Sequence, residues 1–279
     1  MSKIVKVGIV KSGCIGTLPL IEFLLDERAE RKDLEVRVVG SGANMSAEKC
    51  AVVAKEMVEF NPDFAVFISP NATLPGPNKG RTVLSEAGIP TVVVSDGPTK
   101  KISQELEDAG FGFIIIDADA MIGARREFLD PAEMALFNAD VMKVLAVTGV
   151  FNIVFNALDK LISEVKNGKK PTLPRIIVNK ELATEAVEFQ NPYAKSKAIA
   201  AYEISRRVAD LSTEGCFKVK EWESYIAIVS AAHEMMHQAA KLADEVRELE
   251  KSGDTLTRTP HHSDGTILKK KKLVEKPAH

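Results

Sequence analysis

The chain has 279 residues, of which 45% are hydrophobic and 27% charged, enough for one large domain or two modest ones. Its 37 lysines and arginines nearly balance 39 aspartates and glutamates, and the net charge of -2 argues against a dedicated nucleic-acid or polyanion binder. No apolar run approaches the roughly 20 residues that span a bilayer, the N-terminus lacks a signal-peptide pattern, and three widely spaced cysteines predict neither a disulfide framework nor a zinc ribbon. We therefore expect a cytoplasmic protein.

The first 125 residues predict a wound α/β sheet. Five short runs rich in β-branched and aromatic residues alternate with segments of helical spacing, an order typical of βαβ units and a parallel sheet. The run 114–116 is apolar on both faces, as expected for a strand covered on both sides. The predicted strands are residues 4–10, 34–39, 63–69, 91–95 and 112–117, and the predicted helices are 17–28, 46–60, 79–88 and 99–109.

Residues 126–252 predict a helical bundle, because apolar residues recur there at helical spacing. Residues 130–133 read as a helix start, with Asp130 as N-cap and Pro131 in the first turn. The helix continues to about residue 165, with Thr148 and Gly149 as a candidate break. Two further patterns cover 181–210, which Pro192 splits, and 218–251, and the one strand-like run is 175–178.

Residues 253–279 predict a small C-terminal extended β segment. Its four consecutive lysines, 269–272, are interpreted as a solvated face, with a ligand role as the less favoured alternative. The expected fold is thus of the α/β class: a doubly wound, mostly parallel sheet domain (1–125), a helical bundle (126–252) and an extended C-terminal segment (253–279).

The loops after the predicted strands carry the candidate binding residues, because ligands of open wound sheets bind outside the carboxyl ends of the strands. The first loop, 11–17, has glycines that let backbone approach a ligand. The loop 70–80 is too long and proline-rich for a simple connection, whereas turn chemistry alone explains Asp96 and Pro98. The first loop reads GxxG, and no acid follows Val39–Gly42, so an ordinary nicotinamide dinucleotide site is disfavoured, and no Walker loop is present.

Residues 233–237 read His-Glu-Met-Met-His, which formally matches a zinc motif with Glu234 as general base. Its continuation does not match the metzincin pattern, because Ala240 and Ala243 stand where glycine and a third histidine are needed. Only His261, His262 or Asp264 remain to complete a site. Helix packing is therefore the preferred interpretation, and a zinc-dependent hydrolase using His233, Glu234 and His237 stays as an alternative.

Several collinear stretches resemble the archaeal methylenetetrahydromethanopterin dehydrogenases that use coenzyme F420. They are VGIVKSGCIGT (7–17), SPNATLPGPNKGR (69–81), VSDGPTKK (94–101), the long run 232–262 and KKKKLVEKP (269–277). The resemblance implies reversible hydride transfer between reduced F420, as a dissociable co-substrate, and the methenyl cation of tetrahydromethanopterin in methanogenesis and related one-carbon metabolism. It also implies no metal, no prosthetic group and a homo-oligomer, expected as a hexamer.

Direct hydride transfer needs no protein nucleophile, only two carriers held with their reacting carbons about 3–3.5 Å apart in a water-poor cleft. The acceptor is a cation, so a nearby carboxylate would stabilise it, and helix N-termini with lysines would hold the anionic coenzyme tail. A ligand-binding α/β protein without catalysis is the other alternative. The proposed catalytic residues are Asp96, Asp119 and Glu133; the coenzyme-binding residues are Gly13, Cys14, Ile15, Gly16, Thr17, Pro70, Asn71, Thr73 and Lys79; the substrate-binding residues are Asp96, Gly97, Asp119, Met121, Glu133 and His237.

Overall fold

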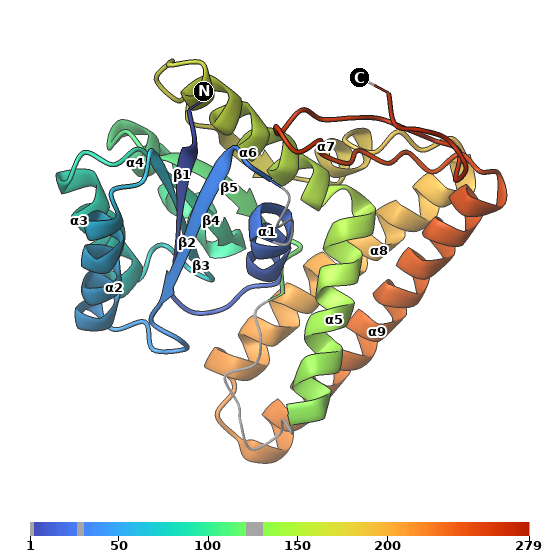
Figure 1. Cartoon of the computed structure of the whole chain (residues 1–279). Coiled ribbons are helices and arrows are strands. Elements are labelled where there is room, and N and C mark those ends of the chain that lie inside the picture. The colour runs from blue at the N-terminus through green and yellow to red at the C-terminus, as the bar shows by residue number, and fades with distance from the viewer. Residues whose placement is uncertain (1–2, 27–30, 121–130, 279) are drawn as a thin grey trace. The chain divides into compact units, whose positions relative to one another are not determined.

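The computed structural model describes residues 3–26, 31–120 and 131–278 (Figure 1). Its contacts divide the chain into two compact units. Unit 1 comprises Met1–Ile116 and Val154–Val178, and unit 2 comprises Asp117–Ile153 and Asn179–His279. This division differs from the expected boundary at residue 125, because a stretch of the second half returns to the sheet.

Unit 1 is built on a six-stranded parallel sheet, which confirms the predicted α/β class. The strand order is β2-β1-β3-β4-β5-β6, and three of the four inner strands, β3, β4 and β5, are buried along their whole length. The strand-like run at 175–178 is a sheet strand, pairing with β5, although it follows the first bundle helices in sequence. The strands are β1 (Val5–Lys11), β2 (Leu34–Gly40), β3 (Phe64–Ser69), β4 (Thr91–Asp96), β5 (Gly112–Ile116) and β6 (Arg175–Val178).

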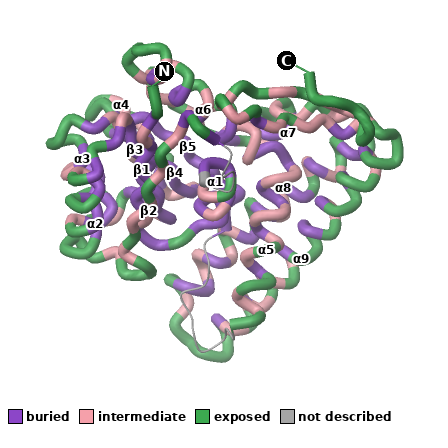
Figure 2. Tube along the Cα trace, in the orientation of Figure 1, coloured by how far each residue is buried: buried purple, intermediate pink, exposed green. Residues whose placement is uncertain are grey.

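Helices cover both faces of this sheet. Figure 1 shows α2 and α3 on one face and α1 on the other. A core cluster joins Val10 and Phe67 of the sheet to Met57 of α2 and Leu84 of α3, and all four are buried. Figure 2 shows the central strands as the most continuously buried part of this unit. The helices are α1 (Thr17–Asp26), α2 (Ala47–Phe60), α3 (Pro75–Glu86), the 3₁₀ helix η1 (Gly97–Ile102) and α4 (Ser103–Asp108).

Helix α3 begins four residues earlier than the sequence predicted. We expected a loop over 70–80, but Pro75 opens the helix. Proline is tolerated there because the N–H groups of a first helical turn have no intrahelical acceptor. Gly76 and Gly80 then let α3 pack closely, since a Cβ on Gly76 would lie 1.8 Å from the carbonyl oxygen of Met45. The long loop is therefore only the short segment 70–74, and Lys79 lies on the helix.

Unit 2 is a bundle in which α5, α8 and α9 run alongside one another (Figure 1). The predicted break is confirmed at Gly149, where φ is +102° and a Cβ would lie 1.9 Å from the carbonyl oxygen of Ala183. The predicted split at Pro192 is also confirmed, because α8 begins there. The helices are α5 (Pro131–Thr148), α6 (Val150–Lys166), which carries the chain into unit 1, α7 (Lys180–Glu185), α8 (Pro192–Thr213), the π-helix η2 (Glu214–Lys218) and α9 (Trp222–Ser252).

The C-terminal segment is extended, as predicted, and is tied together by three antiparallel bridges: Arg258 with Lys270, His261 with Ile267 and Lys269 with Ala278. The carboxylate of Glu275 accepts the backbone N–H groups of Lys271 and Lys272, and these bonds hold the pKa of Glu275 below its usual value. Part of the lysine run is thus folded into a ribbon by its own backbone.

No single helix in the described ranges is both long and apolar enough to cross a membrane; α5 and α6 meet the criterion only as a pair, and they bend by 71° at their junction.

Replacing Gly76 with alanine tests the close packing of α3. We expect Gly76→Ala to lower the free energy of unfolding by about 1–3 kcal/mol, because the added methyl group overlaps backbone and not a flexible side chain. Chemical denaturation followed by circular dichroism measures the change. Ser85→Ala, at an exposed position of the same helix, should stay within about 0.5 kcal/mol of the parent. Equal stability of the two variants would contradict the packing argument.

Candidate functional site

The strand order reverses between β1 and β3, and this defines the candidate coenzyme site. The chain adds β2 on one side of β1 and then crosses to the other side to add β3. Because both neighbours are parallel, the loops after β1 and β3 leave the same edge of the sheet and separate there. Such a switch point is where ligands of wound sheets bind. The two loops that sequence analysis selected are therefore the two that flank it.

The first loop is drawn tightly onto its neighbours. Ser12 donates its N–H to the carbonyl of Ile68 on β3 (2.8 Å), and Gly13 donates to the carbonyl of Gly42 (3.1 Å). Gly13 has φ of +87°, and a Cβ there would lie 2.8 Å from the Pro70 ring. Only glycine combines this conformation with this approach. The first and third loops are thus in contact, as a shared binding surface requires.

Within that loop, the predicted residues differ in how far a ligand can reach them. Ile15 and Thr17 are buried, and Thr17 opens helix α1. Cys14 is exposed, whereas Ser12 is buried and its hydroxyl lies 2.9 Å from the thiol of Cys50. The side chains of Ile15 and Thr17 therefore anchor the loop, and the surface it presents includes Cys14.

The loop after β3 is held in one shape by its own side chains. The side-chain Oδ1 of Asn71 accepts the Thr73 N–H (3.0 Å) and the Thr73 hydroxyl (2.6 Å). The backbone of Ala72 donates to the Thr99 hydroxyl (3.0 Å) and accepts from the Arg81 guanidinium (2.6 Å). These bonds fix the loop from both sides. Thr73 is exposed and Asn71 half-buried, so both remain within reach of a ligand.

The end of β4 adds a hydroxyl network beside this loop. Ser95 donates to the carbonyl of Ser69 (2.7 Å), and its oxygen lies 2.7 Å from the Thr99 hydroxyl. Asp96 is only 7% exposed, and Gly97 opens η1. The burial of Asp96 favours a structural role over direct contact with a ligand.

Cations for an anionic group are present on the same unit. Lys79 on α3 and Lys100 on η1 are exposed, whereas Lys11 donates to Glu22 at 3.2 Å. Arg81 is buried, and this burial lowers the pKa of its guanidinium. Since Arg81 donates to backbone inside the loop, it supports the site and is not part of its surface.

Three further predicted residues lie in unit 2. Asp119 is fully buried, and Glu133 stands in the first turn of α5 with its side chain 40% exposed. His237 lies on α9 with its side chain 55% exposed. Met121 lies outside the described residues. The candidate residues therefore form two groups, one in each unit.

The two histidines of the formal zinc motif each face a carboxylate of α5. His233 Nδ1 lies 3.0 Å from Glu133 Oε1, and His237 Nδ1 lies 3.1 Å from Asp140 Oδ2. Phe137, between the two acids on α5, stacks on the His233 ring with centroids 4.2 Å apart and planes 15° apart. Among the described residues, no group of three histidine, cysteine or carboxylate side chains is placed to hold a metal ion. The motif here forms helix-to-helix pairs.

Comparison with known proteins identifies the chain. A model of the family described as methylene-5,6,7,8-tetrahydromethanopterin dehydrogenase matches residues 5–278. The chain belongs to this family. The F420-dependent methylenetetrahydromethanopterin dehydrogenase of Archaeoglobus fulgidus is 57% identical over 274 residues, covering 98% of this chain and 99% of the relative. That of Methanocaldococcus jannaschii is 55% identical over 275 residues, with the same coverage.

A solved structure of the same family also superimposes on the fold. It is described as an F420-dependent methylene-tetrahydromethanopterin dehydrogenase in complex with methylene-tetrahydromethanopterin and coenzyme F420. The TM-score is 0.95 at 47% identity, covering 99% of this chain and all of that one. The resemblance inferred from the sequence is confirmed. Family membership favours a dehydrogenase over the zinc-hydrolase and the non-catalytic alternatives.

Sequence reasoning missed the residues that attach the segment before Asp119 to the bundle. Tyr202 and Ser205, one turn apart on α8, donate to the Asp117 carboxylate and to the carbonyl of Ala118, each at 2.6 Å. Burial and the Asp117 carboxylate raise the pKa of Tyr202 above its usual value, so its hydroxyl stays protonated. The segment before the buried Asp119 is thereby attached to the bundle. The only sequence signal is a tyrosine and a serine three apart on an amphipathic helix, which is too common to select.

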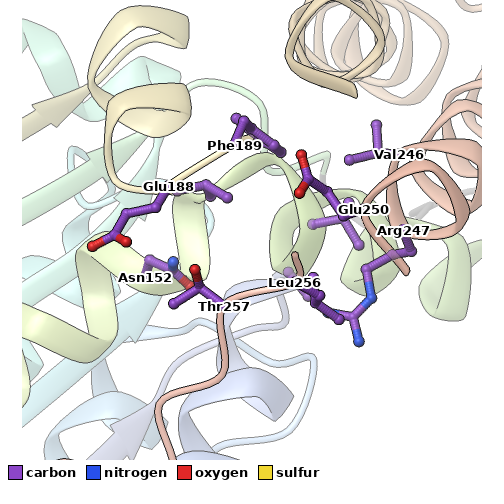
Figure 3. Close-up of a pocket in the computed structure, with 11 residues that line it drawn as sticks. Asn152, Glu188, Phe189, Val246, Arg247, Glu250, Leu256 and Thr257 are labelled. Carbon is purple, nitrogen blue, oxygen red and sulfur yellow. The ribbon is translucent and has the colours of Figure 1, made fainter. Parts of the chain in front are cut away.

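Unit 2 also contains a small pocket of about 70 Å³ (Figure 3). Its buried Glu250 accepts the N–H groups of Gln190 and Asn191, both at 2.9 Å, and the hydroxyl of Thr255 at 2.7 Å. Asn152, on another wall, donates to the carbonyl of Ala186. No described residue of the predicted site lines this pocket. Its polar groups join helix ends, and we assign it a structural role.

The His233–Glu133 pair predicts a pH dependence of stability. Burial lowers the pKa of His233 below its ordinary value of 6.5, although Glu133 and Glu234 oppose this shift. The unfolded chain therefore binds a proton that the folded chain does not, from about pH 6.5 down to the folded pKa, and the free energy of unfolding falls as pH is lowered through that window. In His233→Asn this contribution is absent, so the stability difference between parent and variant should change as pH falls below 6.5.

Denaturant titrations of both proteins across pH 5 to 8 measure this difference. Gln238→Ala, exposed on the same helix, is the control and should keep the parent's pH profile. A constant difference between parent and His233→Asn at every pH would show that the imidazole does not titrate as described.

Proposed function

We propose that the chain is an F420-dependent methylenetetrahydromethanopterin dehydrogenase of methanogenesis and related one-carbon metabolism. It would catalyse reversible hydride transfer between reduced coenzyme F420 and methenyl-tetrahydromethanopterin. The main support is the end-to-end match to family members of that name, at up to 57% identity, together with the related solved structure described as a complex with both ligands. The switch point in the sheet also supports the proposal, because ligands of wound sheets bind at such a point.

We assign the coenzyme to the loops that flank the switch point. The residues present fit a flat heterocycle with an anionic tail: Gly13 lets the first loop pack against Pro70, Asn71 and Thr73 offer polar atoms in a fixed loop, and Lys79 is an exposed cation. When bound, the reduced coenzyme supplies the hydride. These residues bind and orient, and none of them needs to act as nucleophile or general acid.

We assign the positive pterin substrate to the group in unit 2. Of the three proposed carboxylates, Asp96 and Asp119 are nearly or fully buried, whereas Glu133 is 40% exposed. Glu133 is therefore the carboxylate we expect to face the methenyl cation, with His237 nearby on α9. An ionised carboxylate would stabilise the cationic form and lose that interaction as the charge disappears. Gly97 and Met121 remain proposed contacts.

We also propose a homohexamer in the cytoplasm. Large apolar side chains of unit 2, Leu136, Phe217 and Trp222, are between 57% and 68% exposed, as expected for a surface that another subunit covers. Cys14, Cys50 and Cys216 are free thiols, which suits a reducing compartment.

A spectrophotometric assay tests the proposed activity. Purified protein should reduce F420 only when methylene-tetrahydromethanopterin is added, followed at the absorbance of the oxidised coenzyme. In the reverse direction in isotopically labelled water, no solvent label should enter the new methylene group, because the hydride passes directly between the carriers. Ligand binding without turnover would support the non-catalytic alternative, and solvent label in the methylene group would contradict direct transfer.

The loop after β3 provides a second test. Asn71→Ala removes two hydrogen bonds that shape the loop, so we expect the KM for F420 to rise about 5- to 10-fold while the KM for the pterin changes less than twofold. Glu86→Gln, exposed at the far end of α3, should leave both values unchanged. Small, equal effects of Asn71→Ala on both substrates would remove the loop from the coenzyme site.

A further inference from the structure

The proposed function leaves His233, the first histidine of the 233–237 motif, without a role. We propose that His233 is a positioning residue for Glu133: its Nδ1–H donates to Oε1 and fixes the direction in which the carboxylate meets the pterin. This inference rests on the proposed function, specifically on Glu133 facing the substrate cation. Both residues belong to unit 2, and His233 Nδ1 lies 3.0 Å from Glu133 Oε1.

The geometry distinguishes this pair from an ordinary surface ion pair. The His233 side chain is 11% exposed, and its ring stacks on Phe137, which is 4% exposed. Phe137 stands four residues after Glu133, so the carboxylate and the ring that orients its partner lie on the same face of α5. The imidazole is thus held from two directions, by α9 through its backbone and by α5 through stacking. Stacking thus holds the plane of the ring while Nδ1 faces Glu133.

The charge state of the histidine also suits the task. Burial lowers the pKa of His233, while the acids near it, Glu133 on α5 and Glu234 on α9, act in the opposite direction. A neutral imidazole donates a hydrogen bond without bringing a positive charge to the site. The hydrogen bond from His233 therefore adds no positive charge beside a carboxylate that is proposed to stabilise a cation.

The same pairing accounts for the motif's second histidine. His237 pairs with Asp140, and one turn further along α5 Lys143 pairs with Asp244 of α9 at 2.7 Å. The contacts form a ladder between α5 and α9 with His233 and Glu133 at the end nearest the start of α5. Breaking the Lys143–Asp244 pair should weaken the contact between α5 and α9 without changing the direction of the Glu133 carboxylate.

Two polar variants test the role of the Nδ1–H. An asparagine amide places its N–H groups close to the position of Nδ1, whereas a glutamine amide places them near Nε2. In the full-length protein we expect His233→Asn to keep kcat/KM for the pterin within about fivefold of the parent. His233→Gln should lose about 10- to 100-fold, the cost of one misplaced hydrogen bond to a charged group, with the KM for F420 changed less than twofold. Asp244→Asn, which breaks the Lys143 pair, should retain parent activity.

A double-variant experiment with Glu133→Gln provides the second test of the proposal. If His233 acts through Glu133, adding His233→Gln to Glu133→Gln should cause no further loss. Equal activity of folded His233→Asn and His233→Gln, or additive losses in the double variant, would overturn the positioning role and leave the proposed function intact. A parent protein that does not transfer hydride between F420 and the pterin would overturn both. Circular dichroism of each variant confirms that the activities refer to folded protein.

Discussion

The arrangement of unit 1 depends on the close approach of two loops at the point where strand order reverses. β1 pairs with both β2 and β3 from Val7 to Lys11, and the pairing with β2 ends there at Gly40, where the chain leaves the sheet. It turns at Gly13, where a left-handed conformation places the backbone against Pro70. That contact leaves no room for a side chain. The first loop then leads into α1, which begins at Thr17.

In unit 2 the polar side chains are positioned differently, because a helical bundle has no strand ends at which polar loops meet. Its polar chemistry lies in pairs between neighbouring helices, with Glu133 and Asp140 on α5 facing His233 and His237 on α9. The pairing removes both histidines' Nδ1 atoms from competition for a metal ion. A sequence pattern that suggests zinc chemistry on an isolated helix therefore has a different meaning once a second helix with suitably spaced acids packs against it.

Local patterns predicted most of the fold, because each strand and most helices are defined by nearby residues. The β-branched runs predicted five strands to within a residue or two, the strand-like run 175–178 is the sixth, and Gly149 and Pro192 marked real boundaries. The start of α3 was missed because prolines and glycines usually indicate a loop, whereas here Gly76 is required by a neighbour distant in sequence, Met45. The loops at the switch point could be predicted from the wound sheet, but the partnership of Glu133 with a histidine 100 residues away could not. The spacing of apolar residues shows which face of a helix is buried, but only the folded structure shows which helix packs against that face.

The route of the chain has a consequence for how the protein can be divided. After β5 the chain leaves unit 1, builds α5, returns through α6 to add β6, and leaves again. A fragment ending at residue 125 would therefore lack the last strand of its own sheet. Its β5, apolar throughout, would become an unprotected edge with free backbone donors and acceptors, a surface prone to pair with other chains. Each unit is compact, but the two are interleaved along the polypeptide, so neither can be isolated by a single cut.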